Sequence, residues 1–536
     1  MDPIRTTAVL TGEEYDFSAK YLAVSHLRGL AEKQPQEIGP KTIDGLERLF
    51  YNRFVKEQTQ AYFLFKEAAG ALSSVLQHLP HDDRGRKAHD TFMNLLCRTT
   101  GHGNRAVAEA LSALPLTIKG IAPKQETESE MAPVIGWQAL LKTARISSDG
   151  PFCLMGRSLV IQSAERGELL VVKLGRESDH PGTLQREIAW LRHLEQNMDA
   201  LPVRFHIPKP LSVKGHSLFR LQDMPISGRK VKKRHPKGYA IAFLAHTDYF
   251  RYPNQGETEK QLGSKEFLET ICRNAFLFGT LTGRGIIHGA PVPLFHNRVQ
   301  APRRNDHGAY LWERGGRLDQ WLWSCCYPNF GCSGIRDFEH FEVYNGPAKN
   351  AYSSMGAQLL SLFLVAGSYF RMKDSGRVGF EADGRPVDAR ALFDKPLLIK
   401  VVQGVFHHYY QGFVGKSFTG ILPIDFSRLA DRMVDEMGVD RYMDETLRVA
   451  DQQEMTDSGL VGFLVERGVS TSKAKRMKKG EADITLQTGP HLGGFNQPIS
   501  IPELIEAVGT MAALSIYGRY CKEKQKMRNC AYGNPI

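Results

Sequence analysis

The sequence predicts an α+β protein with a helical N-terminal domain, a mixed middle region and a C-terminal helical extension. Apolar residues recur at three- and four-residue steps from about Glu13 to Leu114, which is the period of amphipathic helices. After Phe152 the pattern changes, because two apolar runs, FCLMGRSLVIQS and LLVVKLG, flank the turn AERGE. These runs predict the two strands of a hairpin.

The length and composition predict several folded units. With 536 residues the chain exceeds what one hydrophobic core usually supports. Hydrophobic residues make up 42% and charged residues 24%, which is typical of globular proteins and excludes general disorder. Eight cysteines without regular spacing suggest no disulfide framework, and MDPIRTTAVLTGEEYDF has no apolar secretory segment. We therefore expect a cytoplasmic protein.

The longest apolar run, Leu359 to Ala366, is too short to cross a bilayer, which takes about 20 residues. We expect a buried helix there and no membrane span. Part of the formal net charge of +11 is concentrated in three basic runs, KVKKRHPK at 230–237, PRR at 302–304 and KAKRMKK at 473–479. No recognisable nucleic-acid module surrounds these runs, so we expect solvated loops and no nucleic-acid partner.

The order of the patterns divides the chain. A helical N-terminal domain is expected over 1–120, followed over 121–149 by the polar linker APKQETESEMAP and the helix WQALLKTARI. The hairpin, the helix LQREIAWLRHLEQN and the strand SLFRLQDM fall within 150–227. The long helix SKEFLETICRNAFLFGTLTGRG lies in the region 228–455, beyond the basic loop, and 456–536 form the C-terminal extension, with a short helix at IPELIEAVG.

Two charged residues of the middle region are expected to pair. Lys173 ends the apolar strand LLVVK, and Glu187 lies fourteen residues later, within the apolar stripe of the next helix. A carboxylate bordering an apolar stripe is costly unless a cation meets it. Lys173 is the obvious partner.

A strand lysine paired to a helix glutamate after a glycine-containing hairpin resembles the ATP site of the protein-kinase-like superfamily. Further elements follow in the order of that family. SLFRLQDMP at 217–225 resembles the strand and hinge that border the adenine, GIIHGAPVPLFHN at 285–297 the catalytic loop, and GIRDFEHFE at 334–342 the metal-binding turn. The resemblance implies a two-lobed domain, with an N-lobe over 150–227 and a C-lobe over 228–455 that carries an insertion at 298–333.

The resemblance also implies roles for single residues. Lys173, His288 and Asp337 are the candidate catalytic residues, with His288 expected to brace the loop rather than transfer a proton. The nucleotide would contact residues of the hairpin, helix and hinge, namely Gly156, Lys173, Glu187 and Asp223. Mg²⁺ would be held by Asn297 and Asp337.

The chain departs from the family at the catalytic loop. Ala290 stands where the family has its catalytic aspartate, and Asn297 follows His288 by nine residues rather than seven. The hairpin has no GxGxxG, and roughly forty residues separate Asn297 from Asp337. Without the aspartate, no group at that position accepts a proton from a hydroxyl acceptor.

A second resemblance is to siderophore synthetases of the aerobactin type, which activate carboxylates with ATP. It rests on RDFEHFE, on the pair His296–Asn297, and on a faint match at 473–499. The chain lacks the glutamate and glutamine of the EAHxQN segment of that family.

Three functions remain open at this point. The first is an atypical kinase-like transferase that uses ATP and Mg²⁺ as a phosphotransferase or nucleotidyltransferase on an unknown acceptor, protein or small molecule. The second is an ATP-dependent ligase that activates a carboxylate and releases AMP and pyrophosphate. The third is a catalytically inactive pseudokinase scaffold. The sequence does not indicate an oligomeric state.

Overall fold

The computed structural model describes most of the chain, in segments separated by gaps. The described residues are 3–80, 82–124, 132–146, 152–155, 158–162, 167–175, 182–197, 201–202, 205–223, 238–254, 261–292, 303–304, 310–311, 325, 327–372, 388–438, 471 and 501–531. Gly156, Asn297 and the basic runs at 230–237 and 473–479 lie outside them, so their predicted roles stay predictions.

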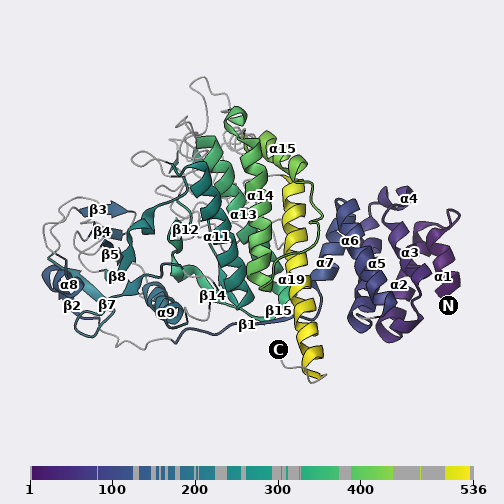
Figure 1. Ribbon diagram of the computed structural model, residues 1–536, viewed down its shortest axis with the longest axis horizontal. Helices are drawn as coiled ribbons and strands as arrows, with labels where there is room; N and C mark the ends of the chain where they lie inside the picture. The colour runs from purple at the N-terminus through teal and green to yellow at the C-terminus, as the bar shows by residue number, and fades with distance from the viewer. Residues whose placement is uncertain are drawn as a thin grey trace.

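The N-terminal region is helical, as the periodicity predicts. Its helices are α1 (Pro3–Thr11), α2 (Phe17–Lys33), α3 (Pro40–Leu49), α4 (Arg53–Lys56), α5 (Ala61–His78), α6 (Asp83–Arg98) and α7 (His102–Ser112), with a 3-10 turn η1 at Pro35–Glu37. Side chains of Asp16, Asn52 and Asp82 cap the starts of α2, α4 and α6 by accepting backbone N–H bonds. In Figure 1 these helices form a separate group around the N-terminus.

The middle region contains one curled sheet. Its strand order is β2 (Val134–Gly136), β7 (Leu218–Gln222), β8 (Tyr239–His246), β5 (Glu168–Leu174), β4 (Ser158–Gln162) and β3 (Phe152–Met155), and β6 (Lys209–Pro210) pairs with β8. The predicted hairpin is present as β4 and β5, but the run FCLMGRSLVIQS forms two antiparallel strands, β3 and β4, instead of the single strand predicted. Lys173 pairs across the sheet with Ser158 on one side and Ile241 on the other, so its strand is central.

Two helices cover opposite faces of this sheet. Leu170 and Val172 of β5 pack in one cluster with α8 (Trp137–Ala144), whereas Val171 belongs to the cluster that contains the apolar face of α9 (Gly182–Gln196). Because side chains alternate along a strand, Lys173 lies on the same side as Val171. The strand period therefore directs Lys173 toward α9.

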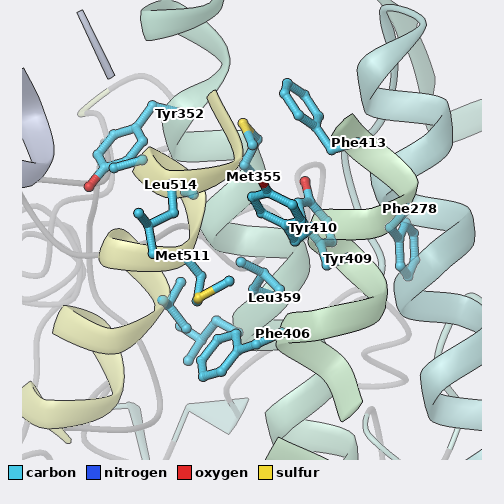
Figure 2. Close-up of a cluster of buried hydrophobic side chains, with 14 of the residues drawn as sticks. Phe278, Tyr352, Met355, Leu359, Phe406, Tyr409, Tyr410, Phe413, Met511 and Leu514 are labelled. Carbon is cyan, nitrogen blue, oxygen red and sulfur yellow. The ribbon is translucent and has the colours of Figure 1, made fainter. Parts of the chain in front are cut away.

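Long helices form the centre of the molecule (Figure 1). They are α11 (Ser264–Gly283), α13 (Ala348–Met372), α14 (Lys395–Val414), α15 (Phe426–Met437) and α19 (Pro502–Ala531). Figure 2 shows side chains of α11, α13, α14 and α19 meeting in one buried cluster that includes Phe278, Leu359, Phe406 and Met511. The helix expected at IPELIEAVG is longer than predicted. Helix α19 runs to Ala531, and its buried apolar positions as far as Tyr520 pack with α13 and α14.

One described helix, Ala348–Arg371, is long and apolar enough to cross a membrane, but 83% of its most apolar window is buried inside the protein. Leu359 and Phe363 are fully buried, as expected for a core helix. The predicted buried helix is therefore present.

The C-terminal helix connects the N-terminal helices to the central ones. Thr510 of α19 donates a hydrogen bond to Asn104 Oδ1 (3.2 Å), and the Tyr517 hydroxyl lies 2.5 Å from His89 Nδ1. Strand β1 (Thr117–Lys119) also pairs with β15 (Asn345–Pro347). Segments distant in sequence thus pack together at this junction.

Short paired strands lie between the sheet and the central helices. Strand β9 (Ile286–His288) pairs with β14 (Phe341–Val343), and β12 (Phe330–Gly331) pairs with β13 (Gly334–Ile335). A further pair, β10 (Arg303–Arg304) with β11 (Tyr310–Leu311), lies within the predicted insertion. The 3-10 turns η3 (Thr247–Phe250), η4 (Phe338–His340) and η5 (Arg390–Leu392) complete the described elements, and the whole is a mixed α+β fold.

Candidate functional site

Lys173 is the centre of a buried group of charges. Lys173 is only 4% exposed. Its Nζ lies 2.7 Å from Glu187 Oε2, 2.8 Å from Asp337 Oδ1 and 3.3 Å from Glu339 Oε2. These carboxylates come from α9 and from the segment just after β13. The sheet, the helix and that segment therefore meet at one ammonium group.

The predicted pairing of Lys173 with Glu187 is confirmed. Glu187 is fully buried in α9, between the apolar residues Leu184 and Leu191. Burial raises the pKa of Glu187 to about 7, against the lowering effect of Lys173, and the carboxylates of Glu339 and Asp337 raise this pKa further. The ion pair is thus confirmed, while the phosphate-binding role of these residues remains a prediction.

Asp337 lies in a tight turn between β13 and η4. Its backbone is left-handed (φ 53°, ψ 57°), a conformation that aspartate tolerates better than most residues. Its side chain remains 32% exposed, whereas Lys173 beside it is buried. Asp337 is therefore the member of the group that faces solvent.

Glu339 was not singled out from the sequence. It follows Asp337 by two residues and is 6% exposed. The motif GIRDFEHFE contained the signal, since a second acid stands beside the aspartate, but its burial against Lys173 depends on the 3-10 turn. Asp337, Glu339 and His340 offer ligand atoms within 4.8 Å of one another, so this turn holds the described residues best suited to a metal ion.

His288 supports the turn from the neighbouring strand. Its Nδ1 accepts a hydrogen bond from the Ala290 N–H (3.1 Å), so its Nε2–H donates to the Arg336 carbonyl (2.9 Å). Burial and the nearby His340 lower the pKa of His288 to about 3. A neutral ring with both nitrogens engaged by backbone acts as a brace, and Ala290 is itself buried.

Arg336 fixes the other side of the turn. Its Nη1 donates to the Tyr249 carbonyl (2.9 Å) in η3, its Nη2 donates to the Pro328 carbonyl, and its guanidinium lies 3.9 Å from the centroid of the Tyr252 ring. Burial also raises the pKa of Tyr249. Arg336 thus joins the turn that carries Asp337 to the segment that follows β8.

An amide near the turn was also missed. The Asn329 side chain donates to the Ala290 carbonyl (2.7 Å), and its backbone carbonyl accepts from the Arg336 N–H (2.8 Å). The backbone bond between Asn329 and Arg336 brings residue 329 beside the residue that precedes Asp337. Sequence spacing could not identify it, because Asn329 follows His288 by 41 residues rather than the seven of the family pattern.

Asp223 is not brought to this group. It directly follows β7 in a left-handed conformation (φ 60°), near Gly136 of β2. The strand that leads into the central helices is β8, followed by η3, so β7 does not form that connection. The strand itself was predicted, but strand pairing decided which strand would precede the helices.

Comparisons with known proteins give one weak similarity. No protein-family model matches the chain. The chain is similar to the calmodulin-dependent glutamylase SidJ of Legionella pneumophila, with 23% identity over 208 residues. These residues make up 36% of this chain and 23% of SidJ, so the match spans less than a quarter of that protein. The similarity supports the kinase-like resemblance only at the level of the superfamily, and it agrees with a transferase in coarse terms.

Proposed function

We propose that the chain is a kinase-like enzyme that binds ATP with a divalent cation and uses the nucleotide to activate a carboxylate group. The observation that carries this proposal is the meeting of Lys173 with Glu187 and Asp337 at 2.7 and 2.8 Å. In kinase-like proteins a strand lysine, oriented by a helix glutamate, holds the phosphates of ATP near a metal-binding aspartate. Here the three residue types come from the corresponding kinds of element.

The proposal assigns the two lobes as follows. The sheet from β3 to β8, with α9, is the N-lobe, and the helices α11, α13, α14 and α15 belong to the C-lobe. The turn η3 connects them, because it follows β8 and comes before α11. The nucleotide binds where Lys173 faces Asp337.

A divalent cation fits the donor groups of the cluster. Asp337 presents a partly exposed carboxylate beside Lys173, and Glu339 lies two residues further on in the same turn. Carboxylate oxygens are the ligands that Mg²⁺ prefers. In this proposal Asp337 holds the cation together with an amide, either Asn297 or the described Asn329, and the bound cation neutralises charge on the phosphate oxygens.

Ala290 favours a carboxylate as the acceptor. A hydroxyl acceptor carries a proton that a base must remove, and Ala290 replaces the aspartate that does so in the family. A carboxylate has a pKa of about 4 and is already ionised at neutral pH, so it needs no base. The similarity to a glutamylase points the same way, because joining glutamate to a carboxyl group requires that carboxyl group to be activated.

The proposed chemistry balances in two steps. An oxygen of the acceptor carboxylate attacks a phosphorus of ATP, and ADP or pyrophosphate leaves. The amine of a glutamate then attacks the activated carbonyl, loses a proton as the amide forms, and displaces phosphate or AMP. Lys173 binds the phosphates in the first step, and Glu187 keeps its ammonium in position.

A protein activator is a further part of the proposal. SidJ is named as calmodulin-dependent, which makes calmodulin the first partner to test. We expect Ca²⁺-loaded calmodulin to raise the rate of ATP consumption by the purified chain. An unchanged rate, together with no change in the fluorescence anisotropy of labelled calmodulin, would remove this partner from the proposal.

The first experiment is a thermal-shift titration with ATP, with and without Mg²⁺, because a ligand of the native state raises its apparent stability. The wild type should show a cation-dependent rise that Asp337→Ala lacks. Asp431→Ala is the matched control, since Asp431 is 53% exposed and pairs only with Lys395 among the ion pairs of the described residues. Absence of any shift at millimolar ATP would favour the pseudokinase scaffold.

Product analysis then separates the enzyme classes. Incubation with ATP, glutamate and a carboxylate-bearing protein should yield AMP and pyrophosphate if a nucleotidyl group is transferred, or ADP if a phosphoryl group is transferred. ADP formation that depends on a hydroxyl acceptor and ignores glutamate would instead support the phosphotransferase alternative.

A further inference from the structure

Two stacked histidine rings lie where the sheet meets the region of the central helices. His206 belongs to the segment between α9 and β6, and His246 is the last residue of β8. The ring centroids are 3.9 Å apart, and the ring planes are inclined by only 13°. Rings this close are in contact, so a positive charge gained by one ring acts directly on the other.

His206 connects its segment to the hairpin β12–β13. The His206 N–H donates a hydrogen bond to the Ser333 carbonyl (3.1 Å), and the buried Phe205 side chain fills the space beside Gly334. A Cβ at Gly334 would collide with Phe205, and its φ of 110° also favours glycine. Strand β13 ends two residues before Asp337, so this contact adjoins the turn of the candidate site.

The same hairpin is bonded to helix α11. Arg273 Nη2 donates to the Cys332 carbonyl, and Asn274 Nδ2 donates to the Gly331 carbonyl (3.0 Å). The hairpin therefore stays with the central helices, whereas the segment of His206 comes from the side of the sheet. The His206 bond is one of the contacts that join the two.

His246 is held by the first turn after β8. Its Nδ1 accepts a hydrogen bond from the Asp248 N–H (3.1 Å), which caps the 3-10 turn η3. Asp248 Oδ2 lies 3.7 Å from the same nitrogen, so a proton added to Nδ1 would face a carboxylate. That proton would also turn Nδ1 from an acceptor into a donor and remove the cap.

The other charged groups near the pair come from the segment after η3 and from α11. Arg251 Nη1 lies 2.9 Å from Glu266 Oε1 and 3.9 Å from Asp248 Oδ1, and Arg251 Nη2 donates to Glu266 Oε2 (3.0 Å). Burial raises the pKa of the Cys332 thiol in the hairpin, which therefore adds no negative charge at neutral pH. Arg251 and Glu266 thus largely compensate each other.

The remaining charges disfavour a proton on His206. Partial burial lowers the pKa of His206, the neighbouring His246 and the Arg273 guanidinium lower this pKa further, and Asp248 opposes them. A proton on His246 meets Asp248, whereas a second proton on His206 meets a cation on each side. The neutral pair is the form that fits the observed stack.

We propose that the stacked pair of His206 and His246 is a proton-sensitive switch, which holds the segment 205–206 against the hairpin β12–β13 at neutral pH and releases it below about pH 6. The first proton removes the cap of η3 and places a positive charge 3.9 Å from the second ring. The inference goes beyond the proposed function, because the switch depends on contacts of the chain itself and on no nucleotide.

The sign of the pH effect follows from the unfolded chain. A free histidine has a pKa of about 6.5, and the fold lowers that of His206. The stabilising contribution of the pair is therefore fully present above about pH 6.5 and is lost as the pH falls. Excluding one proton raises the equilibrium constant for opening by up to about ten-fold between pH 7.5 and pH 5.5.

The test is hydrogen–deuterium exchange of the full chain at pH 7.5 and pH 5.5, with rates corrected for the pH dependence of intrinsic exchange. Peptides over 205–211 and 330–335 report on the contact, and a peptide over 270–283 reports on α11. In the wild type, the protection of the first two should fall by about three- to ten-fold on acidification, while that of α11 stays unchanged. Equal protection of the contact at both pH values would overturn the inference.

His206→Gln and His246→Asn assign the effect to the pair. Asparagine retains a side-chain oxygen that can cap η3. In each variant the acid-induced fall in protection should be less than about two-fold, and the double variant should show no further reduction. The same fall in the wild type and in both single variants would show that other groups cause it.

His78→Gln is the matched control. His78 is an exposed histidine at the end of α5, in the separate group of N-terminal helices (Figure 1). This variant should keep the full acid response of the wild type. Circular dichroism shows whether each variant is folded, and if His246→Asn is not, the exposed His206 and the wild-type response decide the question.

Discussion

Lys173 and Asp337 are 164 residues apart in the sequence, yet Lys173 Nζ donates a hydrogen bond to Asp337 Oδ1 over 2.8 Å. Lys173 lies near the end of the central strand β5, and Asp337 directly precedes the 3-10 turn η4. Their contact links the sheet to the segment packed on the central helices. The energetic consequences of this contact and of its neighbours can be measured.

Lys173→Met should destabilise the protein. The change leaves the carboxylates of Glu187, Asp337 and Glu339 without their shared cation, and removing one partner of a buried pair costs about 3–5 kcal/mol. The loss in the free energy of unfolding should be larger at pH 8 than at pH 6, because Glu187 can bind a proton at the lower pH. Urea denaturation at both pH values measures it.

The control for this change is Lys265→Met, because the Lys265 side chain is 91% exposed. It should alter the free energy of unfolding by less than about 0.5 kcal/mol. If both lysine variants behave alike, the buried charge group does not stabilise the fold as described.

Glu187→Gln should change the pH dependence of stability. The pKa of Glu187 rises from 4.5 in the unfolded chain to about 7 in the fold, so the native state binds more protons between these values. The contribution of Glu187 to stability is therefore lost as the pH rises from about 4.5 to 7, by about 3 kcal/mol at most. The variant should lack this loss.

The measurement is chemical denaturation of wild type and Glu187→Gln at pH 5, 6, 7 and 8. The difference between the two proteins reports on Glu187 and the charges coupled to it, because groups remote from Lys173 titrate alike in both. A wild-type minus variant difference that stays constant across this range would contradict the raised pKa.

His288→Gln should reduce the loss of stability that the wild type shows at low pH, whereas Glu187→Gln acts on the loss at rising pH. The pKa of His288 falls from 6.5 in the unfolded chain to about 3 in the fold, so the unfolded state binds more protons between these values. Wild-type stability contributed by His288 is fully present above about pH 6.5 and is lost as the pH falls toward 3. The variant should be less sensitive to acid over this range.

This change also tests the bracing role. The backbone groups of Ala290 and Arg336 lose their partner, and an unsatisfied buried group costs about 1–3 kcal/mol. We expect lower stability at pH 7, measured by urea denaturation, with no shift in the pH profile of any ATP consumption. A shifted activity profile would show that His288 transfers a proton.

Gly412→Ala should destabilise the packing of α14 on α11. A Cβ at Gly412 would collide with the Phe276 carbonyl of α11, and the reciprocal Gly279 of α11 lies against the Tyr409 carbonyl of α14. Backbone atoms of packed helices cannot move aside cheaply, so we expect a loss of about 1–3 kcal/mol. Thermal unfolding measures this loss.

Gly29→Ala is the matched control in helix α2, since no atom lies within 4 Å of its added Cβ. It should stabilise the protein by about 0.5–1 kcal/mol, because alanine favours the helix. Similar losses in both variants would contradict close backbone packing at Gly412.

The sequence predicted the elements whose evidence is local. The helical period between Glu13 and Leu114 and the apolar run of β5 reflect patterns within single elements, so they could be recognised without contacts. The pairing of Lys173 with Glu187 was also accessible, because a glutamate in an apolar stripe needs a cation. The length of α19 was not, because its stability comes from packing on distant helices.

The sequence by itself determined that this protein has helical ends, a central hairpin and a lysine that meets a helix glutamate. Only the tertiary structure decided that Glu339 and His340 join Asp337, that Arg336 anchors their turn to η3, and that β8 rather than β7 leads into the central helices. The reason is physical: hydrophobic period and charge balance act along one element, whereas the choice of strand neighbours and buried partners depends on contacts between residues far apart in the chain.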